Sequence, residues 1–128
     1  MKVTLLVVGK TDKAYIKEAV NEYCRRLTHY INFEIGVIPD IKKAKNITVE
    51  IQKIKEGELI LARNGIGKEM HLFDEKGKMF SSKEFAAFLE KKMLSGIKEL
   101  VFVIGGPYGF SSQVYEKASS KISLSRMT

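Results

Sequence analysis

The stretch LVFVIGGPYGFSS, Leu100–Ser112, decides the fold. Its unbroken apolar run, Leu100–Ile104, predicts a strand buried on both faces, because a half-exposed strand would alternate apolar with polar residues. The crowded glycines and the proline that follow predict a loop whose main chain a ligand can approach closely. Ligands of open α/β sheets bind beyond the carboxyl ends of strands, so this loop is our candidate site. A plain tight turn is the alternative that the spacing alone leaves open.

Ser111 and Ser112 follow the loop and favour the start of a helix. A serine side chain accepts from the first free N–H groups of a helix, and those N–H groups would point back toward the loop. The G-x-S-x-G pattern of the α/β hydrolases is absent, so we interpret both serines as helix caps and not as nucleophiles. A short helix through Val114, Tyr115 and Ala118 and a last short strand near Ile122–Leu124 complete the chain.

Three further apolar runs predict strands, at Val3–Val8, Phe33–Ile38 and Glu69–Asp74. Three amphipathic stretches predict helices: from Thr11 or Asp12 to Tyr30, from Ile47 to Ala62 with a break near Gly57, and from the capping box Ser81–Glu84 to Gly96. Strands that alternate with helices predict an α/β fold, a mainly parallel sheet with helices on both faces. At 128 residues the chain is expected to form a single domain, residues 1–128.

The apolar spacing also predicts which side chains these helices bury. For the first helix they are Ala14, Tyr15, Ala19, Val20, Tyr23, Leu27 and Tyr30, and for the second Ile47, Ile51, Ile54, Leu59 and Ala62.

Two loops and two histidines are interpreted as structural features and not as functional sites. Asn64–Lys68 is glycine-rich, but a helix precedes it and a strand follows, which is the reverse of a phosphate-binding loop, so we expect a turn. Asp74–Gly77 is expected to leave the third strand as a turn. His29 and His71 have no second ligand at metal spacing, so we predict no metal site, and we expect His71 to be packed and not catalytic.

The chain carries 22 Lys and Arg against 15 Asp and Glu, a net charge of +7, which favours polyanionic partners. Lys42, Lys43 and Lys45 cluster in Ile41–Thr48. They fit either a solvated loop, which we favour slightly, or an arm that contacts phosphates. The single cysteine, Cys24, allows no disulfide within the chain, and Val3–Val8 is too short for a membrane span. We therefore expect a cytoplasmic protein.

The motif VFVIGGPYGFSS, followed by ISLSRMT, resembles the SPOUT (α/β-knot) methyltransferases, and in particular those that act on N3 of a pseudouridine in 23S rRNA. The start MKVTLLVVGK, the helix AVNEYCRRL and the stretch LFDEKGKMFSSKEF agree, so the resemblance covers the whole chain. It implies a trefoil knot, a homodimer, S-adenosyl-L-methionine as cofactor and ribosomal 23S rRNA as substrate.

Carried over by motif, the resemblance implies that the cofactor is held largely by main-chain groups. The implied contacts are Phe73, Gly105, Gly106, Leu124, Ser125, Arg126, Met127 and Thr128.

Members of this family continue beyond the position of Thr128 with a segment that threads the knot, builds much of the dimer and reaches the RNA. We therefore expect this sequence to be truncated at its C-terminus, and we name no catalytic residue. A basic α/β module that binds RNA without catalysis is the alternative function.

Overall fold

The centre of the sheet is β4 (Glu99–Ile104), as its unbroken apolar run predicts. The computed structural model describes residues 1–9, 14–27, 31–39, 47–105 and 108–123. Five strands pair in parallel in the order β2-β1-β4-β3-β5. The other elements are β1 (Lys2–Val8), α1 (Ala14–Leu27), β2 (Asn32–Ile38), α2 (Val49–Leu61), β3 (Lys68–Met79), α3 (Ser82–Leu94), α4 (Ser112–Lys117) and β5 (Ser120–Ser123). The predicted α/β fold with a parallel sheet is confirmed.

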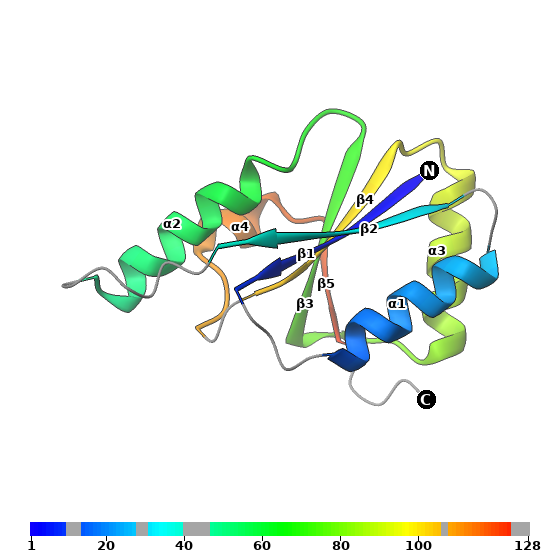
Figure 1. The fold of residues 1–128 in the computed structure, drawn as a ribbon, viewed down its shortest axis with the longest axis horizontal. Coiled ribbons are helices and arrows are strands. Elements are labelled where there is room, and N and C mark those ends of the chain that lie inside the picture. Colours follow the sequence, from blue (N-terminus) through cyan, green and yellow to red (C-terminus); the bar gives the residue numbers. More distant parts are fainter. Residues whose placement is uncertain (10–13, 28–30, 40–46, 106–107, 124–128) are drawn as a thin grey trace.

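Helices cover both faces of the sheet: α1 and α3 lie on one side, and α2 and α4 on the other (Figure 1). Successive side chains of a strand point to opposite faces, so each inner strand supplies both layers. Leu100, Phe102 and Ile104 of β4 pack in the core beneath α1 and α3. Val101 and Val103 pack in the core beneath α2 and α4. All five are at most 1 % exposed, which explains why the sequence shows no polar alternation there.

The inner face of α1 differs in part from the predicted one. Ile16 and Val20 are buried, whereas Tyr15, which the spacing placed in the core, is 51 % exposed. Ile16 and Val20 are four residues apart and so lie one turn apart on the same side of the helix, and Tyr15 points away from that side. The predicted cap at Thr11 or Asp12 and the predicted end at Tyr30 lie outside the described residues.

The predicted break of α2 at Gly57 and its predicted inner face are both wrong. The helix runs without interruption, and its buried residues are Gln52, Glu56, Gly57 and Ile60. A Cβ atom on Gly57 would lie 2.6 Å from Ser111 Oγ and 3.1 Å from Val114 Cγ2. Gly57 therefore lies at a close contact between α2 and the first turn of α4. This contact turns the aliphatic side chains Val49, Ile51, Ile54 and Leu59 toward solvent.

Strand β3 is longer than predicted, because residues Asp74–Gly77 form an irregularity within it and not a turn that ends it. Phe73 and Lys78 both pair with Ile122 of β5, so the four residues between them bulge out of the ladder. A Cβ atom on Gly77 would lie 2.5 Å from the Lys121 carbonyl carbon, so only glycine lets the two backbones meet and the pairing resume.

The predicted capping box at Ser81, the predicted turn at Asn64–Lys68 and the predicted cap at Ser111 are confirmed. Ser81 Oγ accepts from Glu84 N at 3.1 Å, and Ser81 N donates to Glu84 Oε1 at 3.0 Å, which is the predicted capping box. Lys68 N donates to Gly65 O at 3.1 Å across the predicted turn. Ser111 caps α4 by accepting from Val114 N at 3.4 Å.

The α2–α4 contact predicts an unusual response to Gly57→Ala. Alanine for glycine within a helix ordinarily stabilises a protein by about 0.5–1 kcal/mol. Here the added methyl group would collide with the Ser111 cap and with Val114, so we expect the free energy of unfolding to fall by about 1–3 kcal/mol. Urea denaturation measures this change. Gly65→Ala, where a Cβ atom meets nothing within 4 Å, is the matched control. Stabilisation by Gly57→Ala would contradict the contact.

Candidate functional site

The carboxyl ends of β4 and β5 lie beside the middle of β3, where its pairing with β4 stops and its bulge begins. Phe73 of β3 pairs with Ile104 of β4 on one side and with Ile122 of β5 on the other. The loop after β4 and the bulge of β3 therefore begin next to each other, beside Ile122 of β5. The structure thus brings together two of the predicted cofactor contacts, Phe73 and Gly105, at the edge where parallel sheets hold ligands. Gly106 and Leu124, Ser125, Arg126, Met127 and Thr128 lie outside the described residues.

Phe73 can offer a ligand little more than its main chain. Its side chain is 5 % exposed and stacks on Phe102, with ring centroids 5.4 Å apart and the ring planes 12° apart. The ring therefore belongs to the core beneath α1 and α3, and it anchors the backbone of β3 where its pairing with β4 ends.

At Gly105 the main chain of the loop passes close to a side chain of the core. A Cβ atom on Gly105 would lie 2.9 Å from the ring of Phe110. Phe110 is buried against Val114 on the α2–α4 side, and its ring meets Tyr115 edge-on at 5.7 Å. Gly109 has a φ of 80°, a backbone shape that favours glycine, where the loop turns toward α4. In the described part of this loop, Gly105 and Gly109 are therefore glycines for steric reasons.

A hydrogen bond between Asp74 and Tyr115 joins the segment after Phe73 to α4. Tyr115 Oη donates to Asp74 Oδ2 at 2.6 Å, and Lys76 N donates to Asp74 Oδ1 at 2.9 Å. Burial on its own would raise the pKa of Asp74, but these two hydrogen bonds and the Lys121 charge outweigh it, and the pKa is lowered. Burial, followed by the bond to Asp74, raises the pKa of Tyr115 to about 12. Sequence reasoning missed this pair, because no local pattern links residues so far apart.

Two polar side chains lie on the inner face of α2, next to the contact with α4. Gln52 and Glu56 are 7 % and 4 % exposed, and Gln52 Nε2 donates to Glu56 Oε2 at 3.2 Å. A buried carboxylate is costly unless it is hydrogen-bonded. The spacing of four residues places Gln52 and Glu56 on the same face of the helix. The aliphatic residues, however, predicted that the opposite face is the buried one.

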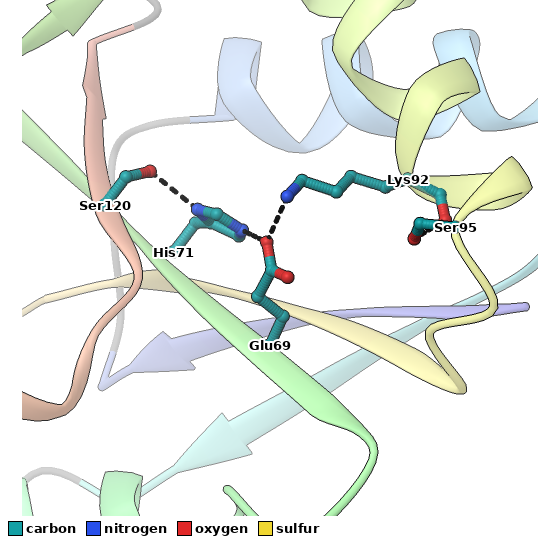
Figure 2. A network of polar contacts seen from close by, with 5 residues as sticks. All are labelled: Glu69, His71, Lys92, Ser95 and Ser120. Carbon is teal, nitrogen blue, oxygen red and sulfur yellow. Dashed lines mark hydrogen bonds and ion pairs between the residues drawn. The ribbon is translucent and has the colours of Figure 1, made fainter.

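His71 is packed, as predicted, and it holds a polar network on the α3 side of the sheet (Figure 2). Its Nδ1 lies 2.6 Å from Ser120 Oγ of β5, and its Nε2 lies 2.7 Å from Glu69 Oε1. Lys92 Nζ of α3 reaches the same Glu69 oxygen at 2.6 Å. Ser95 Oγ donates to the Lys92 carbonyl oxygen at 2.6 Å and helps to end α3. The network ties β3, β5 and α3 together.

The protonation states of this network follow from its burial and partners. His71 is 2 % exposed, and burial lowers its pKa more than the hydrogen bond and charge of Glu69 raise it. Burial would raise the pKa of Glu69, but the bonds from Lys92 and His71 lower it overall. Neutral His71 therefore donates from Nε2 to ionised Glu69 and accepts at Nδ1 from the Ser120 hydroxyl. The rings of Phe88 and His71 meet edge to face, with centroids 5.0 Å apart, so Phe88 of α3 covers His71.

Two features of the described residues bear on other functions. His, Cys, Asp and Glu side chains nowhere gather there in a group of three or more that could hold a metal ion. In the same part of the chain, every helix is too short or too polar to cross a membrane.

Comparison with known proteins identifies the relatives of this chain. The family described as "Predicted SPOUT methyltransferase" matches residues 1–128. A protein of Parabacteroides distasonis named "Ribosomal RNA large subunit methyltransferase H" is 60 % identical over 128 residues, which is all of this chain and 82 % of the relative. Proteins of the same name from Porphyromonas gingivalis and Flavobacterium johnsoniae are 54 % and 51 % identical over the same shares.

The Asp74–Tyr115 bond predicts the effect of Tyr115→Phe. A carboxyl with a lowered pKa stabilises the fold above its unfolded pKa, near 3.8, and this stabilisation is lost as the pH falls through the lower folded pKa. Without the hydroxyl, we expect the pKa of Asp74 to rise, as followed by NMR. The free energy of unfolding at neutral pH should fall by about 1 kcal/mol. Tyr15→Phe, at an exposed tyrosine of α1, is the control. An unchanged Asp74 titration would refute the bond.

The buried His71 predicts a loss of stability in mild acid. Its folded pKa lies below 6.5, so the unfolded chain takes up the proton first. The stabilisation is complete above pH 6.5 and falls as the pH drops toward the folded pKa, by at most about 1.4 kcal/mol per pH unit. Urea denaturation between about pH 7.5 and 5.5 measures this slope. We expect His71→Gln to flatten it, whereas His29→Gln, which removes the other histidine, should preserve it.

Proposed function

Because the chain belongs to the SPOUT methyltransferase family, we propose that it transfers a methyl group from S-adenosyl-L-methionine to N3 of a pseudouridine in 23S rRNA. The family makes the chain a methyltransferase, and the relatives' shared name supports large-subunit ribosomal RNA as the substrate. The observation that carries the proposal is that the glycine loop begins beside the bulge of β3 and beside Ile122 of β5, in a chain that the family matches throughout.

The residues at this edge fit a cofactor that is bound through main-chain groups. The side chain of Phe73 is committed to the core, and Gly105 has no side chain, so the backbone is what both positions offer. We propose cofactor contacts at Phe73, Gly105, Gly106, Leu124, Ser125, Arg126, Met127 and Thr128. The sulfonium of the bound cofactor would supply an activated methyl group. The work of the protein is then to position the target nitrogen in line with it.

Asp74 and Tyr115 support that positioning indirectly, without contacting the reacting atoms. Their bond fixes the segment after Phe73 to α4, and Tyr115 in turn meets the Phe110 ring that packs on Gly105. The bulge of β3 and the end of β4 therefore keep one relative arrangement. Precise placement of this kind is where an enzyme gains rate when its cofactor supplies the reactivity.

The RNA partner is also supported by charge. The net charge of +7 favours a polyanion, and the cluster Lys42, Lys43 and Lys45, which lies outside the described residues, stays a predicted phosphate contact or a solvated loop. Action on the assembled ribosome, a homodimer, a trefoil knot and a cytoplasmic location belong to the same proposal.

Labelled methyl transfer tests the function directly. The protein, as its gene encodes it, is incubated with ribosomes from a strain that lacks the gene and with methyl-labelled cofactor, and the nucleosides are then separated. We expect the label in N3-methylpseudouridine of 23S rRNA. Ribosome binding without cofactor binding or label would instead identify the basic RNA-binding module without catalysis.

Calorimetry on Gly105→Val tests the cofactor site. A branched side chain fills the space beside the loop backbone, so we expect cofactor binding to be lost. The same side chain also collides with Phe110, so the double variant Gly105→Val/Phe110→Leu is needed to relieve the core. If the ligand approaches Gly105, the double variant recovers stability but not binding. Recovered binding would show that Gly105 serves only Phe110. Gly65→Val, in open space, is the control.

A further inference from the structure

Strand β5 is short and lies at the edge of the sheet, so its position depends on few contacts. It has four residues, Ser120–Ser123, and within the part of the chain that the structure describes it pairs only with β3. The bulge of β3 interrupts even this pairing, since Phe73 and Lys78 both pair with Ile122. A slip by one residue would turn every side chain of β5 to the opposite face of the sheet. The register of β5 therefore has to be fixed by particular side chains.

The first residue of β5 carries a side chain that can fix the register. Ser120 pairs with His71 of β3 in the ladder, and its Oγ lies 2.6 Å from His71 Nδ1. Neutral His71 donates from Nε2 to Glu69, so Nδ1 accepts from the Ser120 hydroxyl. Figure 2 shows this bond between the two strands. A slip of one residue would carry the hydroxyl to the other face of the sheet, away from its acceptor.

The acceptor atom of His71 is itself held in place. Nε2 of the same ring lies 2.7 Å from Glu69 Oε1, and Lys92 Nζ of α3 reaches that oxygen at 2.6 Å. The rings of Phe88 and Phe102 pack on the imidazole, with centroids 5.0 Å and 5.8 Å away. His71 is buried, so its ring cannot turn without breaking these contacts. Nδ1 is therefore a fixed point in the core to which β5 is attached.

The same bond determines which residues of β5 lie beside the candidate cofactor edge. His71 lies two residues before Phe73 in β3. Ser120 lies two residues before Ile122 in β5, so both cross-strand pairs lie on one face of the sheet. Ile122 is buried and pairs with Phe73, a proposed cofactor contact, and the proposed contacts at 124–128 follow directly after β5. A strand advances by about 3.3 Å per residue, so a slip of one residue would shift the start of that segment by this distance.

We propose that His71 is a positioning residue for the cofactor and that it acts through Ser120, which holds β5 in the register that binds the ligand. The inference rests on the proposed function and adds to it two residues that are not among the contacts implied by the resemblance. If β5 were not fixed beforehand, cofactor binding would have to order it, and that cost would lower the affinity. A site whose backbone is fixed by a buried hydrogen bond avoids this cost.

Calorimetry with S-adenosyl-L-methionine tests the inference on the protein as its gene encodes it. Ser120→Ala removes the hydroxyl, and we expect it to weaken cofactor binding about fivefold, the effect of one lost hydrogen bond. Ser120→Thr keeps the hydroxyl on a residue that strands favour and should restore most of the affinity. Ser119→Ala is the matched control, because Ser119 is exposed and its N–H, which donates to Met70 O at 2.7 Å, is retained. Equal affinity in Ser120→Ala and the unchanged protein would overturn the inference.

A double-mutant cycle assigns the effect to the bond between the two side chains. His71→Phe replaces the imidazole by an apolar ring and should weaken cofactor binding by at least as much as Ser120→Ala. If both residues act through one bond, adding Ser120→Ala to His71→Phe should cost no further affinity. Effects that multiply would show that the two residues act separately and would overturn the inference. If His71→Phe fails to fold, the comparison of the Ser120 variants decides the question alone.

Urea denaturation separates a positioning role from a merely structural one. A merely structural bond would lower the free energy of unfolding in Ser120→Ala and leave the cofactor affinity of the folded protein unaltered, which would overturn the inference. We expect weaker binding at a temperature at which the variant is fully folded, with changed amide NMR signals confined to β5 and the residues of β3 that pair with it.

The unchanged protein distinguishes failure of this inference from failure of the proposed function. If the unchanged protein binds no S-adenosyl-L-methionine, both are wrong. If it binds the cofactor and the Ser120 variants bind equally well, only the role of His71 and Ser120 is wrong.

Discussion

Burial of β4 on both faces is the constraint on which the other elements depend. A parallel strand in the middle of a sheet has neighbours on both edges and needs apolar cover above and below. β1 and β3 satisfy its edges, while α1 and α3 cover one face and α2 and α4 cover the other (Figure 1). Because all five strands are parallel, they all run toward the same edge. The position of the glycine loop beside the bulge of β3 and the end of β5 follows from that requirement.

Close contacts at three glycines then determine how neighbouring elements pack, which the burial of β4 alone leaves open. Gly57 lets α2 touch the first turn of α4, Gly77 lets β3 rejoin β5 after its bulge, and Gly105 lets the loop pass Phe110. At each position a Cβ atom would lie less than 3 Å from another atom. These contacts act on elements that flank the candidate cofactor edge, so packing and the proposed function constrain the same residues there.

The two edges of the sheet have different chemistry. At the carboxyl edge, the end of β4 lies beside Phe73 of β3, and a side-chain hydrogen bond joins Asp74 to Tyr115 of α4. At the amino edge, the ion pairs Lys2–Glu34 and Lys68–Glu99 and the charge of Arg63 line a hollow. Between them, the Glu69–His71–Ser120 network is buried under α3 and ties β3 to β5 (Figure 2).

The sequence by itself determined the strands, their parallel order as a fold class, the capping box at Ser81–Glu84 and the glycine loop. These features are written in local patterns: unbroken apolar runs, a serine three residues before a glutamate, and clustered glycines. It also led to Phe73 and Gly105 through resemblance, and the fold pairs Phe73 with Ile104, the residue before Gly105.

Only the tertiary structure decided which face of α2 is buried, that β3 continues past Asp74, and that Asp74 reaches Tyr115. In α2 the aliphatic spacing pointed to Ile51 and Ile54, but the contact of Gly57 with Ser111 and Val114 turned Gln52 and Glu56 inward instead. Each of these outcomes depends on an atom supplied by a distant part of the chain. A local pattern cannot predict the position of such an atom. The pattern indicates which side chains a segment can bury, but not which atoms will pack against them.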